Sequence, residues 1–374
     1  MLLKNADLLD KSFRFIKADL LIKNGKIAEI GEIDSSLDND VIDCSGKYVI
    51  PGLVDIHTHG CGGSDTCDAS KEALDVLSKT QGDAGITSFC ATTMTLPEAD
   101  LEKIFSIIKD YMSGEQKKAN IIGINMEGPF FNASKKGAQR GDCLKTPDIK
   151  FFTHLNSISN NAVKLVDMAP ELDGSMEFIR AVKDDVTVSI GHTAADYDIA
   201  TKAIRNGATH ITHLYNAMNG LTHRAPGVIG AASDSNVTTE LICDGIHIDA
   251  SAIRAAFKLM DGRVCLISDS MSATGMPNGE YELGGQKVFV KDKKATLIDG
   301  TIAGSSTNLM DCVRKAVSFG IPLTTAIKSA TFNPAKAIKM ENKIGSLDIN
   351  LDADVLVMDK DLALEKVIIK GICK

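Results

Sequence analysis

Short hydrophobic runs alternate along the central part of the chain with longer segments whose apolar residues recur at helical spacing. We expect strands over 53–57, 86–91, 121–126, 164–168, 186–190, 210–213, 240–243 and 264–268. Helices are expected between most of them, for example over 71–81, 98–112, 175–184, 196–206 and 250–260. This alternation predicts an α/β fold of the (β/α)8 barrel type, with a doubly wound open sheet as the alternative.

The two ends of the chain have a different pattern, made of short β segments. Asn24 and Gly25 lie between two apolar runs, which is typical of a hairpin. We expect residues 1–50 and 341–374 to form one discontinuous β-sandwich domain and residues 51–340 to form the barrel. The rhythm of the barrel is broken at 278–303, where a β-hairpin insertion is expected, and helices resume over 307–318 and 323–340.

Composition and charge limit the classes of protein that the chain can belong to. Apolar residues make up 44% and charged residues 24%, as in ordinary globular proteins. The net charge of −8 argues against a non-specific binder of nucleic acid or of an anionic membrane. The nine cysteines are scattered and contain no C-x-x-C pair, which favours reduced core residues over disulfides. Charges interrupt any N-terminal signal sequence, and no apolar stretch approaches the ~18 residues of a membrane span. A cytoplasmic protein is therefore expected.

The first barrel strand ends in two histidines, within residues 49–60, VIPGLVDIHTHG. Pro-Gly precedes the apolar run and glycines follow it, as expected for a buried strand between turns. Because side chains alternate along a strand, His57 and His59 point the same way. Two such imidazoles can hold a metal ion, and the alternative is a pair of hydrogen-bonded histidines in a turn.

Four more chemically active residues follow later strands of the predicted barrel, where the reactive groups of such barrels lie. They are Glu127, His192, His213 and Asp269, after the third, fifth, sixth and eighth strands. Individually, the acids could cap turns or helices and the histidines could be hydrogen-bonded core residues. Six such residues at one end of one barrel favour a metal site, and this set of imidazoles and carboxylates suits Zn²⁺ or Fe²⁺.

The sequence resembles the amidohydrolase superfamily in residues 51–60, PGLVDIHTHG, in the candidate ligands and in residues 344–357, IGSLDINLDADVLV. Within that superfamily it is similar to the N-acetylglucosamine-6-phosphate deacetylase family. The matching stretches are HGCGG (59–63), MEGPFF (126–131), KKGAQ (135–139), GHT (191–193), THLYNAM (212–218), HRAPG (223–227), DGIH (244–247), SDSM (268–271) and IAGS (302–305).

The resemblance implies metal-dependent hydrolysis of N-acetylglucosamine 6-phosphate to glucosamine 6-phosphate and acetate. Glu127, His192 and His213 would be the main metal ligands. Some relatives replace the first His-x-His by Gln-x-Asn and hold one ion. Because this chain keeps His57 and His59, the resemblance allows one or two ions, with Glu127 bridging and Asp269 adjacent. Asp269 would be the general base and then the general acid.

The resemblance also implies substrate contacts. His247 would bind the acyl oxygen or a sugar hydroxyl, and Arg224 with Asn216 and Ala217 would bind the phosphate. The sugar pocket would be lined by Ala138, Gln139, Ile302, Ala303 and Gly304. Gln139 stands where other members have His. In this family the phosphate site lies near a subunit contact, so a homodimer is expected, and the subunit that Arg224 serves stays open.

Two other functions compete with this one. The first is a different amidohydrolase, such as a cyclic amidase or a deacetylase of unphosphorylated sugars. Such cyclic amidases often bridge their metals with a modified Lys, whereas Glu127 stands at the matching place here, and Arg224 favours a phosphate. The second is a non-catalytic barrel that serves as an assembly scaffold, which should lack several of the six residues that are all present here.

Overall fold

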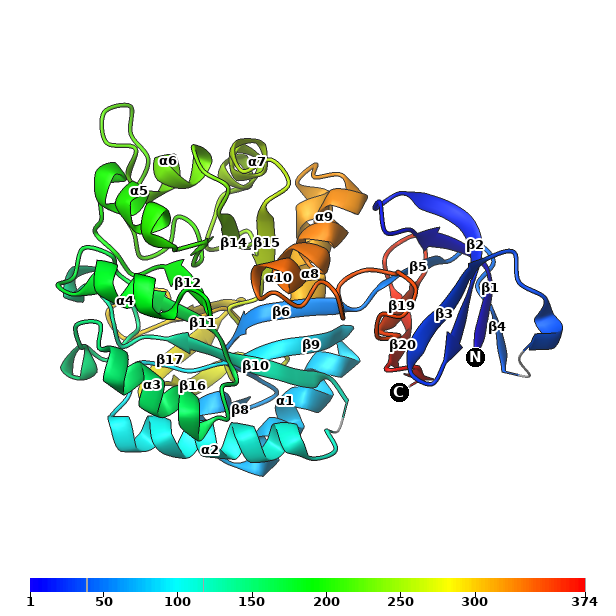
Figure 1. The fold of residues 1–374 in the computed structure, drawn as a ribbon, viewed down its shortest axis with the longest axis horizontal. Helices are drawn as coiled ribbons and strands as arrows, with labels where there is room; N and C mark the ends of the chain where they lie inside the picture. Colours follow the sequence, from blue (N-terminus) through cyan, green and yellow to red (C-terminus); the bar gives the residue numbers. More distant parts are fainter. Residues whose placement is uncertain (38–39, 117, 374) are drawn as a thin grey trace.

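The computed structural model describes residues 1–37, 40–116 and 118–373, which form a large α/β part and a smaller β part beside it (Figure 1). In the large part, eight parallel strands pair in sequence order. They are β6 (Leu53–Thr58), β9 (Ile86–Thr92), β10 (Asn120–Glu127), β11 (Val163–Met168), β12 (Thr187–Ile190), β13 (His210–Ile211), β14 (Thr238–Ile242) and β15 (Val264–Ile267). A parallel bridge between Thr58 and Ser270 joins the last strand to the first. The predicted barrel is confirmed.

Helices cover the outside of this barrel (Figure 1). The expected ones are α1 (Lys71–Asp83), α2 (Glu98–Ser113), α4 (Ser175–Val182), α5 (Tyr197–Asn206) and α7 (Ala250–Leu259). The structure adds α3 (Ile149–Ile158) and α6 (Gly227–Ser233). Six of the seven residues of α6 are buried, so this helix has no polar face and no helical alternation of polar and apolar residues.

The chain after the eighth strand carries the insertion and the last helices. β16 (Gly279–Leu283), β17 (Gln286–Lys291) and β18 (Lys294–Thr296) form a three-stranded antiparallel sheet within the region predicted for a hairpin. α8 (Leu309–Ser318) follows it. The helical region predicted over 323–340 is divided into α9 (Leu323–Ser329) and α10 (Phe332–Ala337). Pro334 explains the division, because its ring excludes the carbonyl of a preceding helical turn.

The smaller part is built from both ends of the chain, as predicted. β1 (Leu2–Leu9), β2 (Phe15–Lys23), β3 (Lys26–Gly31), β4 (Val41–Asp43) and β5 (Tyr48–Pro51) pair in one sheet with β19 (Val355–Met358), β20 (Leu364–Ile369) and β21 (Ile372–Cys373). β5 and β19 join the two segments, and both termini lie in this part (Figure 1). The division of the chain at 50/51 and 340/341 stays a prediction.

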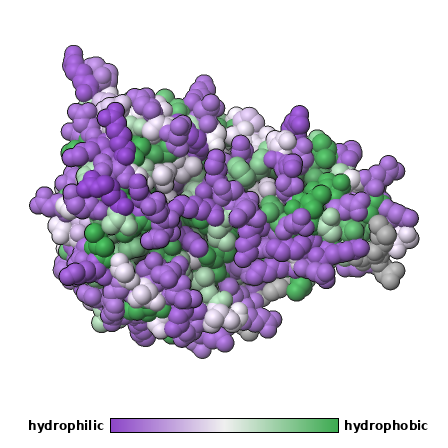
Figure 2. Space-filling model, viewed as in Figure 1, coloured by the Kyte–Doolittle hydropathy of each residue, from purple (hydrophilic) through white to green (hydrophobic). Residues whose placement is uncertain are grey.

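The face of the molecule seen in Figure 1 is mainly polar. Figure 2 shows hydrophilic residues over most of the face seen in Figure 1, with hydrophobic residues scattered between them. Within the described ranges, none of the helices combines the length and the apolar character needed to cross a bilayer.

Candidate active site

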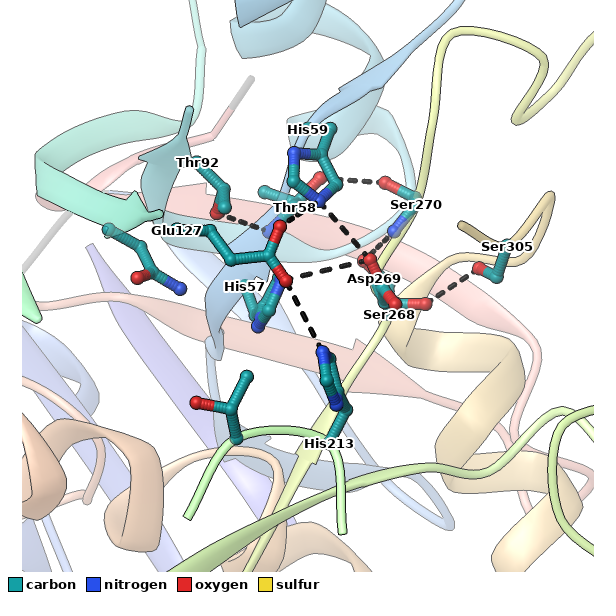
Figure 3. Close-up of polar contacts among 12 residues, drawn as sticks. His57, Thr58, His59, Thr92, Glu127, His213, Ser268, Asp269, Ser270 and Ser305 are labelled. Atoms are coloured by element: carbon teal, nitrogen blue, oxygen red, sulfur yellow. Dashed lines mark hydrogen bonds and ion pairs between the residues drawn. The ribbon is translucent and has the colours of Figure 1, made fainter. Parts of the chain in front are cut away.

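The six predicted metal-site residues meet at the C-terminal end of the barrel. All of them except His192 are labelled in Figure 3, where their side chains point toward one another. Glu127 lies at their centre. Its Oε1 atom is 3.1 Å from His192 Nε2 and 3.2 Å from His213 Nε2. Its Oε2 atom is 3.3 Å from His59 Nε2, and Asp269 Oδ1 is 3.4 Å from the same ring nitrogen. The carboxylate of Glu127 therefore lies between two groups of imidazoles.

The donor atoms of this cluster fit a metal ion. His192 Nε2 and His213 Nε2 lie 3.0 Å apart, and both face Glu127. The Nε2 atom of His57 is buried and makes no hydrogen bond, although it lies 3.4 Å from Glu127 Oε1 and 3.7 Å from Asp269 Oδ1. Ring nitrogens and carboxylate oxygens that converge in this way are the usual ligands of Zn²⁺ and Fe²⁺.

Charge is concentrated in the cluster. Burial by itself lowers the pKa of His59, but the carboxylates of Asp269 and Glu127 outweigh burial and raise that pKa to about 10. Burial has the opposite effect on a carboxyl group and by itself raises the pKa of Asp269. The hydrogen bond to His59 and the charges of the nearby imidazoles outweigh burial and lower this pKa overall. Both effects describe a buried site in which carboxylates stay ionised and attract positive charge.

Three of the site residues adopt left-handed backbone conformations that are uncommon for residues other than glycine. The φ angles are 46° at His192, 24° at His213 and 48° at Asp269. Each follows the end of a barrel strand, where the backbone must turn sharply out of the sheet. Strain of this kind is held only when the surrounding structure fixes it, and it is common at functional sites.

Residues behind the cluster fix the orientation of its imidazoles. The carbonyl of Lys135 accepts a hydrogen bond from His192 Nδ1 at 3.0 Å, and Glu240 Oε2 lies 2.9 Å from His57 Nδ1. His247 Nδ1 lies 2.7 Å from Asp244 Oδ2. Glu240 and Asp244 were not singled out from the sequence. A buried acid in an apolar strand was the available signal for Glu240, because such residues are rarely buried without a partner.

A cavity of about 400 Å³ opens above the cluster. Among the residues expected to contact substrate, those on its wall are Ala138, Gln139, Asn216, Ala217, His247, Ile302 and Gly304. Ala303 is fully buried and is not on this wall. Arg224 is exposed to solvent outside the cavity. Among the described residues, the wall includes one Lys, Lys135, and no Arg. Lys135 was not predicted to contact the substrate.

Gln139 is on the wall, but its amide is used by the protein. Its Nε2 donates to Glu127 Oε2 at 2.6 Å, and its Oε1 accepts from the Thr95 backbone N–H at 2.7 Å. The side chain thereby connects the loop after β9 to the central carboxylate of the cluster. This geometry makes Gln139 a support for Glu127 as much as a part of the cavity wall.

The chain is similar to known proteins over almost its whole length. Residues 48–373 match the amidohydrolase family. The chain is 34% identical to an N-acetylglucosamine-6-phosphate deacetylase from Bacillus subtilis (strain 168), over 97% of this chain and 96% of the relative. It is 32% identical to an N-acetylgalactosamine-6-phosphate deacetylase from Escherichia coli O157:H7, over 94% of this chain and 93% of the relative.

The fold is also that of a solved enzyme structure. A variant N-acetyl-D-glucosamine-6-phosphate deacetylase from Mycobacterium smegmatis, in complex with N-acetyl-D-glucosamine 6-phosphate, superposes with a TM-score of 0.93. The two proteins are 30% identical, and the superposition covers 100% of this chain and 98% of the other.

Proposed function

The chain belongs to the amidohydrolase family and, within it, to the N-acetylglucosamine-6-phosphate deacetylase family, and we propose that it hydrolyses N-acetylglucosamine 6-phosphate to glucosamine 6-phosphate and acetate. The observation that carries the proposal is the cluster of imidazoles and carboxylates at the floor of a cavity of about 400 Å³. An amide is a weak electrophile with a poor leaving group, so its hydrolysis needs both an activated water and a protonated nitrogen.

The cluster would hold one or two divalent ions, Zn²⁺ or Fe²⁺. Glu127, His192 and His213 form one set of ligands, and His57, His59 and Asp269 form the other. When bound, such an ion supplies an acidified water and polarises the acyl oxygen.

Asp269 moves the proton in this proposal. Its carboxylate lies at the cavity wall beside His59, and its lowered pKa keeps it ionised and ready to accept a proton. It takes one proton from the attacking water as the new C–O bond forms at the acyl carbon. It then gives that proton to the amide nitrogen as the C–N bond breaks, so that the amino sugar leaves as an amine and acetic acid is formed, which loses its own proton to give acetate.

His247 would bind the acyl oxygen or a sugar hydroxyl. Its hydrogen bond with Asp244 fixes the ring, and this bond outweighs the effect of burial, so the pKa of His247 is raised. The imidazole is therefore favoured as a hydrogen-bond donor towards the cavity.

The phosphate would be bound where Asn216 and Ala217 lie on the cavity wall and Lys135 adds a cation. Arg224 lies outside this cavity. In a homodimer, Arg224 of one subunit would bind the phosphate held in the cavity of the other subunit. A cytoplasmic location also stays a prediction.

The experiment that tests the function measures metal per chain together with acetate release from three sugars. The sugars are N-acetylglucosamine 6-phosphate, its unphosphorylated form and its 4-epimer, N-acetylgalactosamine 6-phosphate. We expect bound metal and strongest turnover of the phosphorylated glucosamine derivative. Faster turnover of the epimer would move the assignment to the function named for the Escherichia coli relative. Bound metal without turnover of any of the three would overturn the proposal.

A further inference from the structure

Glu240 is a buried carboxylate that lies behind the candidate metal site and does not line the cavity. It belongs to β14, the seventh barrel strand, and its side chain is fully shielded from solvent. Its Oε2 atom lies 2.9 Å from His57 Nδ1 and accepts the His213 backbone N–H at 3.0 Å. Its Oε1 atom lies 3.3 Å from His210 Nε2. Burying a carboxylate is costly, and three donors offset that cost here.

The contact with Glu240 decides which nitrogen of His57 carries the proton. An ionised carboxylate only accepts hydrogen bonds, so His57 Nδ1 must be the donor. In the neutral ring the lone pair is then on Nε2. That atom faces Glu127 Oε1 at 3.4 Å and Asp269 Oδ1 at 3.7 Å and has no hydrogen bond of its own.

The candidate ligands differ in what supports them from behind. His192 Nδ1 is held by a neutral backbone carbonyl, that of Lys135. His213 Nδ1 is buried with no hydrogen-bond partner among the described residues. His57 is the one of these three rings that is backed by a carboxylate. A carboxylate behind an imidazole fixes its orientation and makes its other nitrogen a stronger metal ligand.

The same oxygen of Glu240 also holds the backbone at His213, which has a φ of 24°. His210, on the other side of the carboxylate, is fixed by Thr238, whose Oγ1 atom lies 2.5 Å from His210 Nδ1. Glu240, in the middle of β14, thus connects the end of β6 with the start of β13 and the segment that follows β13 through one buried network. Glu240 and His210 do not line the cavity, so Glu240 acts on the His57–His59–Asp269 half through His57, while its bond to the His213 backbone supports the other half.

We propose that Glu240 is the positioning residue that presents His57 Nε2 to the metal site and thereby sets the affinity of the His57–His59–Asp269 half for an ion. This inference rests on the proposed metal-dependent function. It makes the metal affinity of the His57–His59–Asp269 half depend on a residue that lies outside the cavity.

The test is equilibrium binding of Zn²⁺ to the full-length chain at buffered free metal, with ions per chain measured by elemental analysis. Glu240→Leu is expected to weaken the more weakly bound ion by roughly 10–100-fold, the effect typical of losing such a supporting partner. Glu240→Gln, whose amide oxygen can still accept from His57 Nδ1, is expected to cause a smaller loss. If the leucine variant does not fold, the glutamine variant carries the test.

A double-mutant comparison separates positioning from general destabilisation. In a His57→Gln background, Glu240→Gln should cause no further loss of affinity at the His57–His59–Asp269 half, because the effect of Glu240 on that half passes through His57. Asp19→Asn is the matched control, since Asp19 is a buried carboxylate that also accepts three hydrogen bonds, from Lys4 and from the backbones of Asn5 and Ile33. It should lower stability and leave metal affinity unchanged.

Nitrogen chemical shifts of the histidines in the Zn²⁺-loaded protein add a readout that stability alone would not move. His57 should carry its proton on Nδ1 in the wild type and lose this preference in Glu240→Leu. Wild-type affinity in both Glu240 variants, or a loss that persists without His57, would overturn the inference and leave the proposed function intact. A wild-type chain that binds no ion would instead overturn the proposed function, and this inference with it.

Discussion

The side-chain amide of Gln139 donates to Glu127 Oε2 at 2.6 Å while its oxygen accepts from the Thr95 backbone N–H at 2.7 Å. A residue expected to contact the sugar is therefore committed to holding the central carboxylate of the metal cluster. Gln139 is 2% exposed, so each of these two bonds is shielded from water. In such surroundings an unmade hydrogen bond costs more than it does at the surface.

Replacing Gln139 by leucine should affect stability and activity together. The buried Thr95 N–H would lose its partner, and the free energy of unfolding should fall by about 1–3 kcal/mol. Activity should also fall, since Glu127 would lose the bond that orients it. Urea unfolding and steady-state kinetics measure the two effects. Gln139→Glu is the control for shape, and it should be more harmful to activity because it brings a second carboxylate against Glu127. Unchanged activity in the leucine variant would contradict the supporting role.

Replacing Asp269 by asparagine should lower kcat by about 10²–10⁴-fold, because the proton acceptor and donor of the reaction is lost. Metal should remain bound, since Glu127, His192 and His213 form a separate group of residues that could hold an ion. Kinetics and metal content on the same sample check both parts. An active asparagine variant would rule out Asp269 as the acid–base residue.

Replacing Lys135 by methionine should weaken binding of the phosphorylated sugar and spare the metal site. His192 is held by the backbone carbonyl of Lys135, which the substitution keeps. We expect KM for N-acetylglucosamine 6-phosphate to rise about 10-fold, the order of one hydrogen bond to a charged group. Lys136→Met is the matched control, because the Lys136 ammonium contacts the carbonyls of Gly137 and Gln139 and this residue is not on the cavity wall. Equal effects at both positions would contradict a phosphate contact by Lys135.

If the chain forms the proposed homodimer, hybrid dimers can decide which active site Arg224 serves. Arg224→Gln chains and Asp269→Asn chains should each be nearly inactive alone. If Arg224 serves the neighbouring subunit, mixing the two should restore activity, because the Arg224→Gln chain keeps Asp269 and receives an intact arginine from its partner. If Arg224 serves its own subunit, mixed dimers contain no complete site and stay inactive. The measurement is acetate release after the chains are unfolded and refolded together, with each variant refolded alone as the control.

The stability of the chain should depend on the protonation of Asp354, near the junction of the two parts. Burial raises the pKa of this carboxyl from 3.8 to about 6. Between about pH 4 and 6 this carboxyl group is therefore protonated more often in the folded state than in the unfolded state. The stability that it contributes is fully present below about pH 4 and is lost as the pH rises through 6. The Lys370 backbone N–H donates to Asp354 Oδ1, and an asparagine oxygen can accept the same bond.

Asp354→Asn should remove this dependence. The unfolding free energy of the variant relative to wild type should rise by about 1–3 kcal/mol between pH 4.5 and pH 7.5, at about 1.4 kcal/mol per unit of pKa. Denaturant titrations in the presence of a chelator measure it, with the exposed Asp361→Asn as the control. A difference that does not change with pH would show that Asp354 ionises normally.

Local sequence patterns were sufficient to predict the barrel strands and most helices, because the spacing of apolar residues is set by the geometry of a strand or a helix alone. The positions of the six candidate metal-site residues were also predictable, because they could be read from the ends of the predicted strands. Each lies within two residues of the end of a strand, and parallel strands of a barrel bring those ends to the same face. Neither prediction requires the contacts between residues that are far apart in the sequence.

Only the tertiary structure decided the contacts that hold these residues in place. Glu240 and His57 are far apart in sequence, and their pairing depends on the closure and register of the barrel. The hydrogen bond from Gln139 to Glu127 depends on loops that pack against several strands. The same holds for the position of Lys135 on the cavity wall and of Arg224 outside it. Sequence periodicity determines which way a side chain leaves its own strand. The partner that it meets is determined by how all eight strands close around one another.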